Sequence, residues 1–282
     1  MSSAAHYKEE MRKEWTTAAP GWRKWDHLLS EGFREASEKL LDAAGLSPGM
    51  HVLDLASGSG EPALSAARRV APDGRVLATD LVPEMLSIAE EKARRAGITN
   101  FEARPCDAEA LPFEDGSFDA VTCRFGIMFF PQPKAALDNV RRVLRPGGRA
   151  AFVAWGTVAA NPYFNIPLGH LAKYASFPEP DPERPNPFKY AAPGVMESRL
   201  KEGGFRLVRE ERLNVTIQQS LSPDRYLEAF SDIAAPFRPL VEGLPPADRS
   251  RLADELAQTL HQYWDGTFLR LPAEIVLGVG VK

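Results

Sequence analysis

A glycine-rich loop after the first apolar run is the strongest sign of chemistry in the sequence. It reads Asp54-Leu-Ala-Ser-Gly58-Ser-Gly60-Glu-Pro-Ala63, and its glycines let the backbone turn sharply and approach a ligand closely. The loop enters a helix N-terminus, whose free N–H groups favour negative charge. Gly58-x-Gly60-x-x-Ala63 also fits the dinucleotide fingerprint, with Asp80 at the distance expected for an acid that binds ribose. The loop alone therefore leaves a dinucleotide open.

Three features favour a different adenosine-containing ligand. Asp54 lies inside an otherwise apolar strand, where a buried carboxylate is costly unless it is paired. Pro62 removes a donor from the first helical turn, where a pyrophosphate would need donors. Asp107 follows the third expected strand, and an acid there can accept a hydrogen bond from the adenine amino group. These features indicate a ligand that carries adenosine but no phosphate.

Four segments occur in the order and spacing of a known family. VLDLASGSGEPAL, ATDLVPEML, CDAEALPFEDGSFDAVTCRFGIMFF and VLRPGGR resemble the motifs of class I S-adenosylmethionine (SAM) dependent methyltransferases. They most resemble the ubiquinone/menaquinone-biosynthesis-type, methyltransferase type 11-like branch that acts on small molecules. The match covers about residues 45–155. It departs at Glu61-Pro62, where many members carry a third glycine or threonine, and this changes the entry into the helix.

The resemblance implies SAM as cofactor, S-adenosylhomocysteine as product, and a role for each matching residue. Asp54 would hold the loop and approach the methionyl ammonium, and Asp80 would accept both ribose hydroxyls. The remaining expected cofactor contacts are Ala56, Ser57, Gly58 and Gly60 at the methionine part, Leu81 and Met85 over the adenine, Asp107 and Ala108 at the adenine edge, and Arg124 and Phe125 near the sulfonium and the acceptor. Three simpler roles stay open: Asp54 as a loop anchor, Asp107 as a turn or helix cap, and Arg124 as a salt-bridge partner.

Methyl transfer from a sulfonium mainly requires that the protein align the acceptor atom with the methyl group, at about 3–3.5 Å, and exclude water. A general base is needed only where the acceptor must lose a proton. His27, His170 and His261 lie in expected cap segments and are candidate bases, and Arg124 is a further candidate catalytic residue. No histidine pair has metal-ligand spacing, so no metal is predicted.

The alternation of apolar runs with helical patterns predicts the elements that position these residues. Strands are expected at 51–56, 75–79, 101–104, 118–123, 149–155, 206–215 and 273–281, with helices at 61–70, 83–96, 134–144 and 194–202. Such alternation predicts an α/β fold, a Rossmann-like doubly wound sheet. The resemblance implies seven mostly parallel strands in the order 3-2-1-4-5-7-6, with the last strand antiparallel. In such sheets the ligand lies at the carboxyl ends of the strands.

The chain is expected to divide into a core and helical cap segments. We expect an N-terminal helical cap segment (1–47), the SAM-binding core (48–155), an irregular cap insertion rich in proline and aromatic residues (156–193) and the rest of the core (194–282) with a helical insertion at about 222–268. The caps must supply the walls of an acceptor pocket. Their aromatic residues favour a flat or lipophilic acceptor, with Trp22, Trp25, Tyr163 and Phe164 as candidate contacts.

Composition excludes several classes of protein. The net charge of −4 gives no general attraction to nucleic acid. Cys106 and Cys123 are the only cysteines, too few for a disulfide scaffold, and are expected to be buried thiols. Residues 1–12 are polar and charged, unlike a signal peptide, and no apolar run is long enough to span a bilayer. We expect a cytoplasmic monomer or homodimer that acts on a small-molecule methyl acceptor.

Three alternatives stay open at this stage. One is an NAD(P)-dependent oxidoreductase with a Rossmann fold, which Asp54, Pro62 and Asp107 disfavour. Another is a protein of the same fold with other chemistry, such as aminopropyl transfer. The third is a non-catalytic SAM-binding protein that acts through partners.

Overall fold

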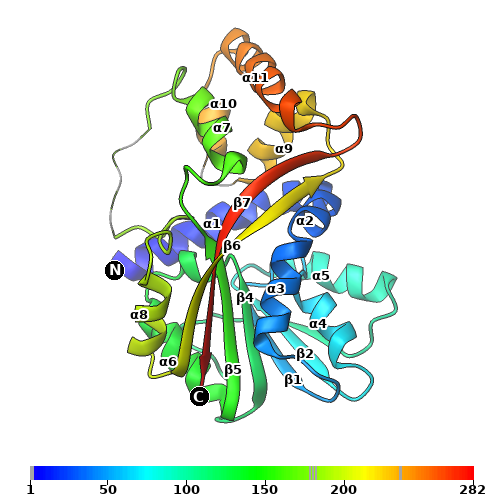
Figure 1. Cartoon of the computed structure of the whole chain (residues 1–282), viewed down its shortest axis with the longest axis vertical. Coiled ribbons are helices and arrows are strands. Elements are labelled where there is room, and N and C mark those ends of the chain that lie inside the picture. The colour runs from blue at the N-terminus through cyan, green and yellow to red at the C-terminus, as the bar shows by residue number, and fades with distance from the viewer. Residues whose placement is uncertain (1–2, 178, 180, 182, 235–236) are drawn as a thin grey trace.

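A seven-stranded sheet forms the centre of the computed structural model, which describes residues 3–177, 179, 181, 183–234 and 237–282 (Figure 1). The strands are β1 (His51–Leu55), β2 (Arg75–Asp80), β3 (Phe101–Pro105), β4 (Phe118–Arg124), β5 (Leu144–Trp155), β6 (Arg206–Gln219) and β7 (Leu269–Val281). Their order is β3-β2-β1-β4-β5-β7-β6. β7 runs antiparallel to both of its neighbours, and all other pairs are parallel. The predicted fold class and strand order are confirmed.

Helices cover both faces of the sheet. Figure 1 shows α3 (Arg34–Ala44), α4 (Ala63–Val70) and α5 (Pro83–Arg95) on one side, and α6 (Pro133–Val143) and α8 (Val195–Glu202) on the other. The apolar positions of α4 recur every three or four residues and pack on β1 and β2. With both faces covered, β1 is an almost wholly buried run, as parallel strands in such sheets are.

A cap stands above the carboxyl ends of the parallel strands. It consists of α1 (Ser3–Lys24), α2 (Asp26–Gly32), α7 (Pro162–Leu171), α9 (Tyr226–Ile233), α10 (Arg238–Glu242) and α11 (Pro246–Leu260), with short 3-10 turns η1 (Ile127–Phe129), η2 (Pro223–Arg225) and η3 (His261–Tyr263). β6 and β7 extend beyond the other strands into this cap (Figure 1). The part of the cap from η2 to η3 is thus inserted between two paired strands of the sheet, β6 and β7.

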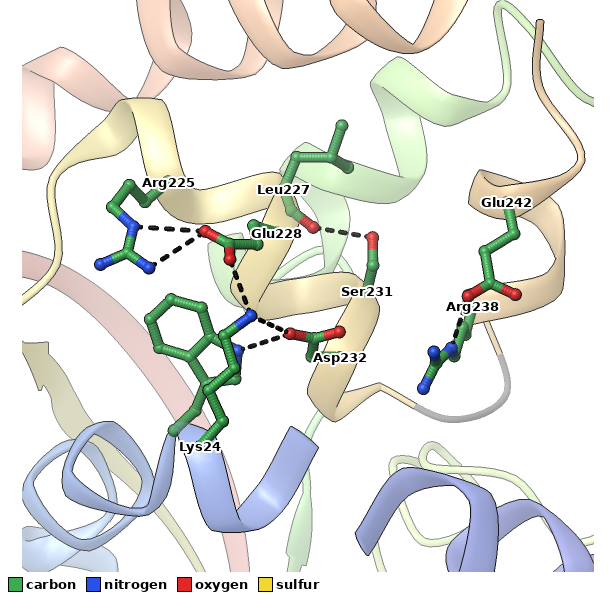
Figure 2. Close-up of polar contacts among 9 residues, drawn as sticks. Lys24, Arg225, Leu227, Glu228, Ser231, Asp232, Arg238 and Glu242 are labelled. Atoms are coloured by element: carbon green, nitrogen blue, oxygen red, sulfur yellow. Dashed lines mark hydrogen bonds and ion pairs between the residues drawn. The ribbon is translucent and has the colours of Figure 1, made fainter. Parts of the chain in front are cut away.

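The junction of α1 with α9 joins the N-terminal helix to the cap (Figure 2). Lys24 Nζ donates to Glu228 at 2.7 Å and to Asp232 at 2.8 Å. The indole Nε1 of Trp25 also donates to Asp232, at 2.9 Å. The Arg225 guanidinium lies 4.7 Å from the Trp25 ring centroid, within cation–π range. These contacts fix the end of α1 against a segment that is about 200 residues away in the sequence.

The observed elements differ from the predicted ones in several places. β5 begins at Leu144 rather than 149, because Leu144 pairs with Phe118 before an irregularity in the register. β6 and β7 are each four residues longer toward the cap, since they pair with one another there. Helix α7 forms in the segment expected to be irregular, and α3 packs on the sheet rather than in the cap. The prolines at 178, 180, 182 and 236, which were expected in the cap, lie outside the described residues.

Two further findings concern the described residues alone. None of their helices combines the length and apolarity that crossing a bilayer requires. Both cysteines are free, Cys123 fully buried and Cys106 partly exposed.

Candidate functional site at the carboxyl ends of the central strands

One cavity lies where β1, β2, β4 and β5 end, beneath α1 and the cap. Thirteen of the predicted site residues line it: Trp22, Ala56, Ser57, Gly58, Asp80, Leu81, Met85, Asp107, Ala108, Arg124, Phe125, Tyr163 and Phe164. Segments that are far apart in the sequence meet here because the carboxyl ends of parallel strands share one edge of the sheet.

The glycine loop and Asp80 form the polar floor of the cavity. The two Asp80 carboxylate oxygens accept the backbone N–H groups of Gly58 and Val82, each at 2.9 Å. Burial raises the pKa of Asp80, although these N–H bonds act in the opposite direction. Gly58 has φ +52°, and a Cβ there would lie 3.1 Å from the ring of Trp22. The loop therefore needs glycine at this position both for its backbone and for its close approach to α1.

Gly60 allows close packing between the glycine loop and α5. It does not line the cavity, and a Cβ at this position would lie 2.9 Å from the Cβ of Ala89 in α5. Its φ of +106° is unfavourable for any residue with a side chain. The structure thus gives Gly60 a packing role between loop and helix and no place against a ligand.

Asp54 is fully buried in β1 beside the cavity floor. Its Oδ1 accepts the Thr122 hydroxyl at 2.5 Å, while its Oδ2 has no hydrogen-bond partner among the described residues. Burial raises the pKa of Asp54 from an ordinary 3.8 to about 6, against the opposing hydrogen bonds from Thr122 and Ser57. Asp54 therefore anchors the neighbouring strand and leaves one carboxylate oxygen free for a donor.

Lys8 of α1 closes the end of the cavity next to Asp107. Its Nζ lies 2.6 Å from Asp107 Oδ2 and 2.5 Å from Glu109 Oε2. The other Asp107 oxygen accepts the backbone N–H of Glu109 at 2.9 Å, which is the turn role left open above. An adenine amino group at Asp107 would have to share this carboxylate with Lys8.

Arg124, at the end of β4, is a partly buried cation that lines the cavity. Its Nη1 donates to the Ser37 hydroxyl at 2.7 Å, and its guanidinium lies 5.5 Å from the Phe33 ring centroid. Nε has no partner, and no described carboxylate lies within ion-pair distance. Burial lowers the pKa of Arg124, while the charges of Glu61, Asp54 and Asp26 act in the opposite direction. A guanidinium remains charged in such surroundings, so this one can hold an anionic group.

The backbone at two strand ends adopts a rare conformation. Ala56, which follows β1, has φ +50°, and Phe125, which follows β4, has φ +58°. Both residues line the cavity. Non-glycine residues in this region of φ carry strain, and such strain gathers at functional sites.

Aromatic side chains form one wall of the cavity. Phe125 stacks on Trp155 with ring centroids 4.1 Å apart and an interplanar angle of 8°. Phe33 and Phe164 meet Trp155 edge-on at 5.7 and 5.0 Å, and Tyr163 lies 5.9 Å from Trp155 with its ring nearly parallel. This part of the cavity can hold a flat apolar molecule.

Six predicted site residues lie away from the cavity lining: Asp54 and Gly60, described above, Trp25, and the three histidines proposed as bases. His27 and His261 are exposed, and His170 is hydrogen-bonded to Glu255 at 3.0 Å and Thr259 at 2.9 Å. The candidate bases therefore have no support in the geometry. Of the two tryptophans proposed, Trp22 lines the cavity, and Trp25 instead packs in the α1–α9 junction.

Sequence reasoning missed several lining residues, among them Lys8, Trp15, Phe33, Glu61 and Trp155. Trp155 could have been found, because it ends the fifth strand at the same edge as the predicted loops. Glu61 stands where the motif departs from its family, which is a second usable signal. Lys8, Trp15 and Phe33 reach the cavity through the placement of α1 and α3, which no local pattern reveals.

The arrangement can bind and align, and it shows little that could move a proton. One end presents carboxylates and backbone groups, and the other presents aromatic faces. Cys106 lines the cavity near Asp107, but burial raises its pKa to about 11, so it stays a thiol at neutral pH. The described residues contain no group of three or more histidine, cysteine or acidic side chains that could hold a metal.

Comparison with known proteins identifies the central part of the chain. Residues 52–148 match the family model of the methyltransferase domain. The chain is 43% identical over 149 residues to the uncharacterized protein Rv1405c of Mycobacterium tuberculosis, which covers 51% of this chain and 53% of that protein. It is 36% identical over 161 residues to the ubiquinone/menaquinone biosynthesis C-methyltransferase UbiE of Xanthomonas campestris, which covers 56% of this chain and 64% of that enzyme. The chain thus spans between half and two thirds of the length of these relatives.

The fold has solved counterparts. The YcgJ protein from Bacillus subtilis is similar with a TM-score of 0.58 and 21% identity, over 88% of this chain and 98% of that one. At this identity the likeness concerns the fold alone.

Proposed function

Because residues 52–148 match the family model of the methyltransferase domain, we propose that this protein is a class I SAM-dependent methyltransferase that transfers the methyl group of SAM to a small, flat, apolar molecule. The observation that carries the proposal is the two-ended cavity. Gly58, Asp80 and Asp107 form a polar end suited to the adenosyl part of SAM, and the stacked Phe125–Trp155 pair forms an apolar end suited to the acceptor.

The polar end fits SAM in its details. Each Asp80 oxygen already accepts one backbone N–H, and each keeps a lone pair for a ribose hydroxyl. The free Oδ2 of Asp54 can accept from the methionyl ammonium directly or through water. Ala108 and Asp107 lie where the adenine edge would be recognised, with Leu81 and Met85 as its apolar cover.

Arg124 is the residue we propose for the methionine carboxylate. Its partly buried charge has no ion-pair partner in the described parts of the chain, and a charge that is partly removed from water without a partner is unfavourable. The charges of Asp54 and Glu61 act on it, so it lies near the methionine side of the glycine loop. A bound carboxylate would compensate it.

SAM, when bound, supplies a methyl group that needs no further activation. The residues of this chain then have two tasks, to hold the acceptor in line with that methyl group and to keep water out. The aromatic wall does both. The carboxylates that line the cavity are at its polar end or paired with Lys8, so we propose that the acceptor atom is nucleophilic without a protein base.

The printed name of the Xanthomonas relative points to one acceptor class. That enzyme is named as a C-methyltransferase of ubiquinone and menaquinone biosynthesis. A ring carbon of a quinone-type molecule is therefore a reasonable first acceptor to test here, and the aromatic wall is compatible with it.

Titration calorimetry with SAM, S-adenosylhomocysteine and NAD tests the cofactor. We expect micromolar binding of the two adenosyl ligands, loss of this binding in Asp80→Ala, and none for NAD. Asp73→Ala, which alters an exposed turn, is the matched control and should bind like the wild type. Binding of NAD alone would replace the proposal with the oxidoreductase alternative.

A second experiment separates turnover from mere binding. The protein is incubated with SAM labelled in the methyl group and with a panel of quinone-type and phenolic acceptors, and products are analysed for label. Labelled acceptor supports methyl transfer. SAM binding without labelled acceptor across the panel, with the label recovered in 5′-methylthioadenosine, the fragment that keeps the methyl group after the propyl chain of SAM has been transferred, would instead indicate aminopropyl-type transfer.

A further inference from the structure

The aromatic wall contains one hydroxyl group whose surroundings are unusual. Tyr163 begins the first turn of α7 and is 5% exposed. Its ring meets Phe33 at 5.9 Å and Phe164 at 5.0 Å, both edge-on, and lies parallel to Trp155. The Tyr226 hydroxyl donates to its carbonyl oxygen at 2.9 Å. Ring and backbone are therefore held from several sides.

The Tyr163 hydroxyl forms no hydrogen bond with any residue that the structure describes, although it belongs to a nearly buried side chain. Tyr226, which is just as buried, is satisfied by the Tyr163 carbonyl. The Tyr163 hydroxyl is not among the fully buried polar atoms that lack a partner, so its oxygen reaches the open space of the cavity as an unpaired donor. Because Tyr163 lines the cavity, a bound molecule can supply the missing partner.

The protonation state of Tyr163 decides what that partner must be. Burial raises the pKa of Tyr163 well above its ordinary value of 10. The phenol is therefore protonated at neutral pH and presents an O–H donor in an apolar wall. It is a poor base, so it would orient an acceptor without removing its proton.

We propose that Tyr163 is a specificity-determining residue, whose hydroxyl donates a hydrogen bond to an oxygen on the ring of the methyl acceptor. The Phe125–Trp155 stack would hold the ring, and the Tyr163 hydroxyl would fix its rotation in the plane of that stack. The inference rests on the proposed function for the identity of the reaction, but the hydrogen bond itself can be measured without SAM.

The experiment compares two ring molecules that differ in one oxygen. 1-Indanone carries a carbonyl oxygen that only accepts hydrogen bonds, and indane is the same ring system without it. Dissociation constants are measured by ligand-observed NMR titration, with and without saturating S-adenosylhomocysteine, for the wild type and for Tyr163→Phe. We expect the wild type to prefer 1-indanone, and Tyr163→Phe to bind 1-indanone about 3- to 10-fold more weakly while binding indane unchanged.

Tyr190→Phe is the matched control. Tyr190 is a buried phenol whose hydroxyl also has no partner among the described residues, but it does not line the cavity. Removing its hydroxyl should leave both dissociation constants unchanged. A thermal unfolding curve for each variant shows whether the fold is intact.

Several outcomes overturn the proposal. The wild type could bind both probes equally or neither of them, Tyr163→Phe could weaken both to the same extent, or Tyr190→Phe could weaken 1-indanone as much as Tyr163→Phe does. The measurement without S-adenosylhomocysteine keeps this test separate from the proposed function. That function fails if SAM does not bind, whatever the two probes show.

Discussion

Ionisation of the Asp54 carboxyl beside the cavity floor makes the free energy of unfolding depend on pH. Its folded pKa of about 6 lies above the ordinary 3.8 because of burial. Below about pH 3.8 both the folded and unfolded states hold the proton, so ionisation costs nothing. Above about pH 6 the folded state carries the full penalty, about 3 kcal/mol for a shift of this size. Stability is therefore lost as pH rises through this window.

We expect Asp54→Asn to remove that dependence. The free energy of unfolding of the wild type, measured relative to the variant by urea denaturation, should fall by about 2.4 kcal/mol between pH 4 and 7. Asp73→Asn, an exposed position, should titrate like the wild type. Parallel curves for wild type and Asp54→Asn would show that the carboxyl is ionised at an ordinary pKa.

The same carboxyl should couple SAM binding to pH. If the free Oδ2 accepts from the methionyl ammonium, binding favours the ionised form, and the affinity for SAM should rise about tenfold between pH 5 and 7.5. Calorimetry of wild type and Asp54→Asn at the two pH values measures this. An equal pH dependence in both proteins would assign the effect to another group.

The sequence predicts the place of a single site residue where that residue belongs to a loop at the end of an expected strand. Asp80 and Gly58 follow from the spacing of the glycine loop and the second strand. Lys8 could not be predicted, because its carboxylate partners are about 100 residues away and nothing in the sequence near Lys8 indicates them. The three histidines were misplaced for the same reason: their segments belong to the cap, but their side chains do not line the cavity.

At the scale of elements, the placement of α1 depends on its junction with α9. Asp232 accepts from both Lys24 and the indole of the almost fully buried Trp25. We expect Asp232→Ala to lower the free energy of unfolding by about 2 kcal/mol, because the indole N–H loses its acceptor inside the protein. The measurement is a denaturant titration followed by tryptophan fluorescence.

Glu228→Ala is the control for this prediction. Glu228 pairs with the same lysine, but both side chains are 46% exposed, and exposed pairs contribute about 0–1 kcal/mol. A loss for Glu228→Ala as large as that for Asp232→Ala would attribute the effect to charge at the junction rather than to the buried indole.

The sequence predicts which helices and strands form better than it predicts where the helices of the cap lie. The alternating strands and helices of residues 51–155 follow from apolar periodicity because each element packs against its neighbours in sequence. α7 was not predicted, since Pro162 and Pro167 suggested an irregular segment. Pro162 in fact stands in the first turn, where its missing N–H costs nothing.

At the scale of the whole molecule, the cavity joins the sheet and the cap, α1 included. A ligand that fills it should stabilise both together. With S-adenosylhomocysteine at about 100 times its dissociation constant, the stabilisation should be about 2.7 kcal/mol, which corresponds to an increase in Tm of about 5–10 °C for a chain of this size. Thermal unfolding monitored by circular dichroism checks this, and Asp80→Ala should show no increase. Separate transitions for cap and sheet would show that the cavity does not join them.

The way the cap is inserted has a consequence for how such proteins can diversify. The chain leaves the sheet after Gln219 and returns at Leu269, and these two residues are paired with each other. A segment whose ends are neighbours can be exchanged for another of different length without disturbing the register of the strands that carry it. The glycine loop and Asp80 belong to the strand ends, whereas Ile233, Ala234 and Phe237 of the exchanged segment line the same cavity. Grafting the corresponding segment of a relative between these two positions is therefore a direct route to a new acceptor range on an unaltered donor site.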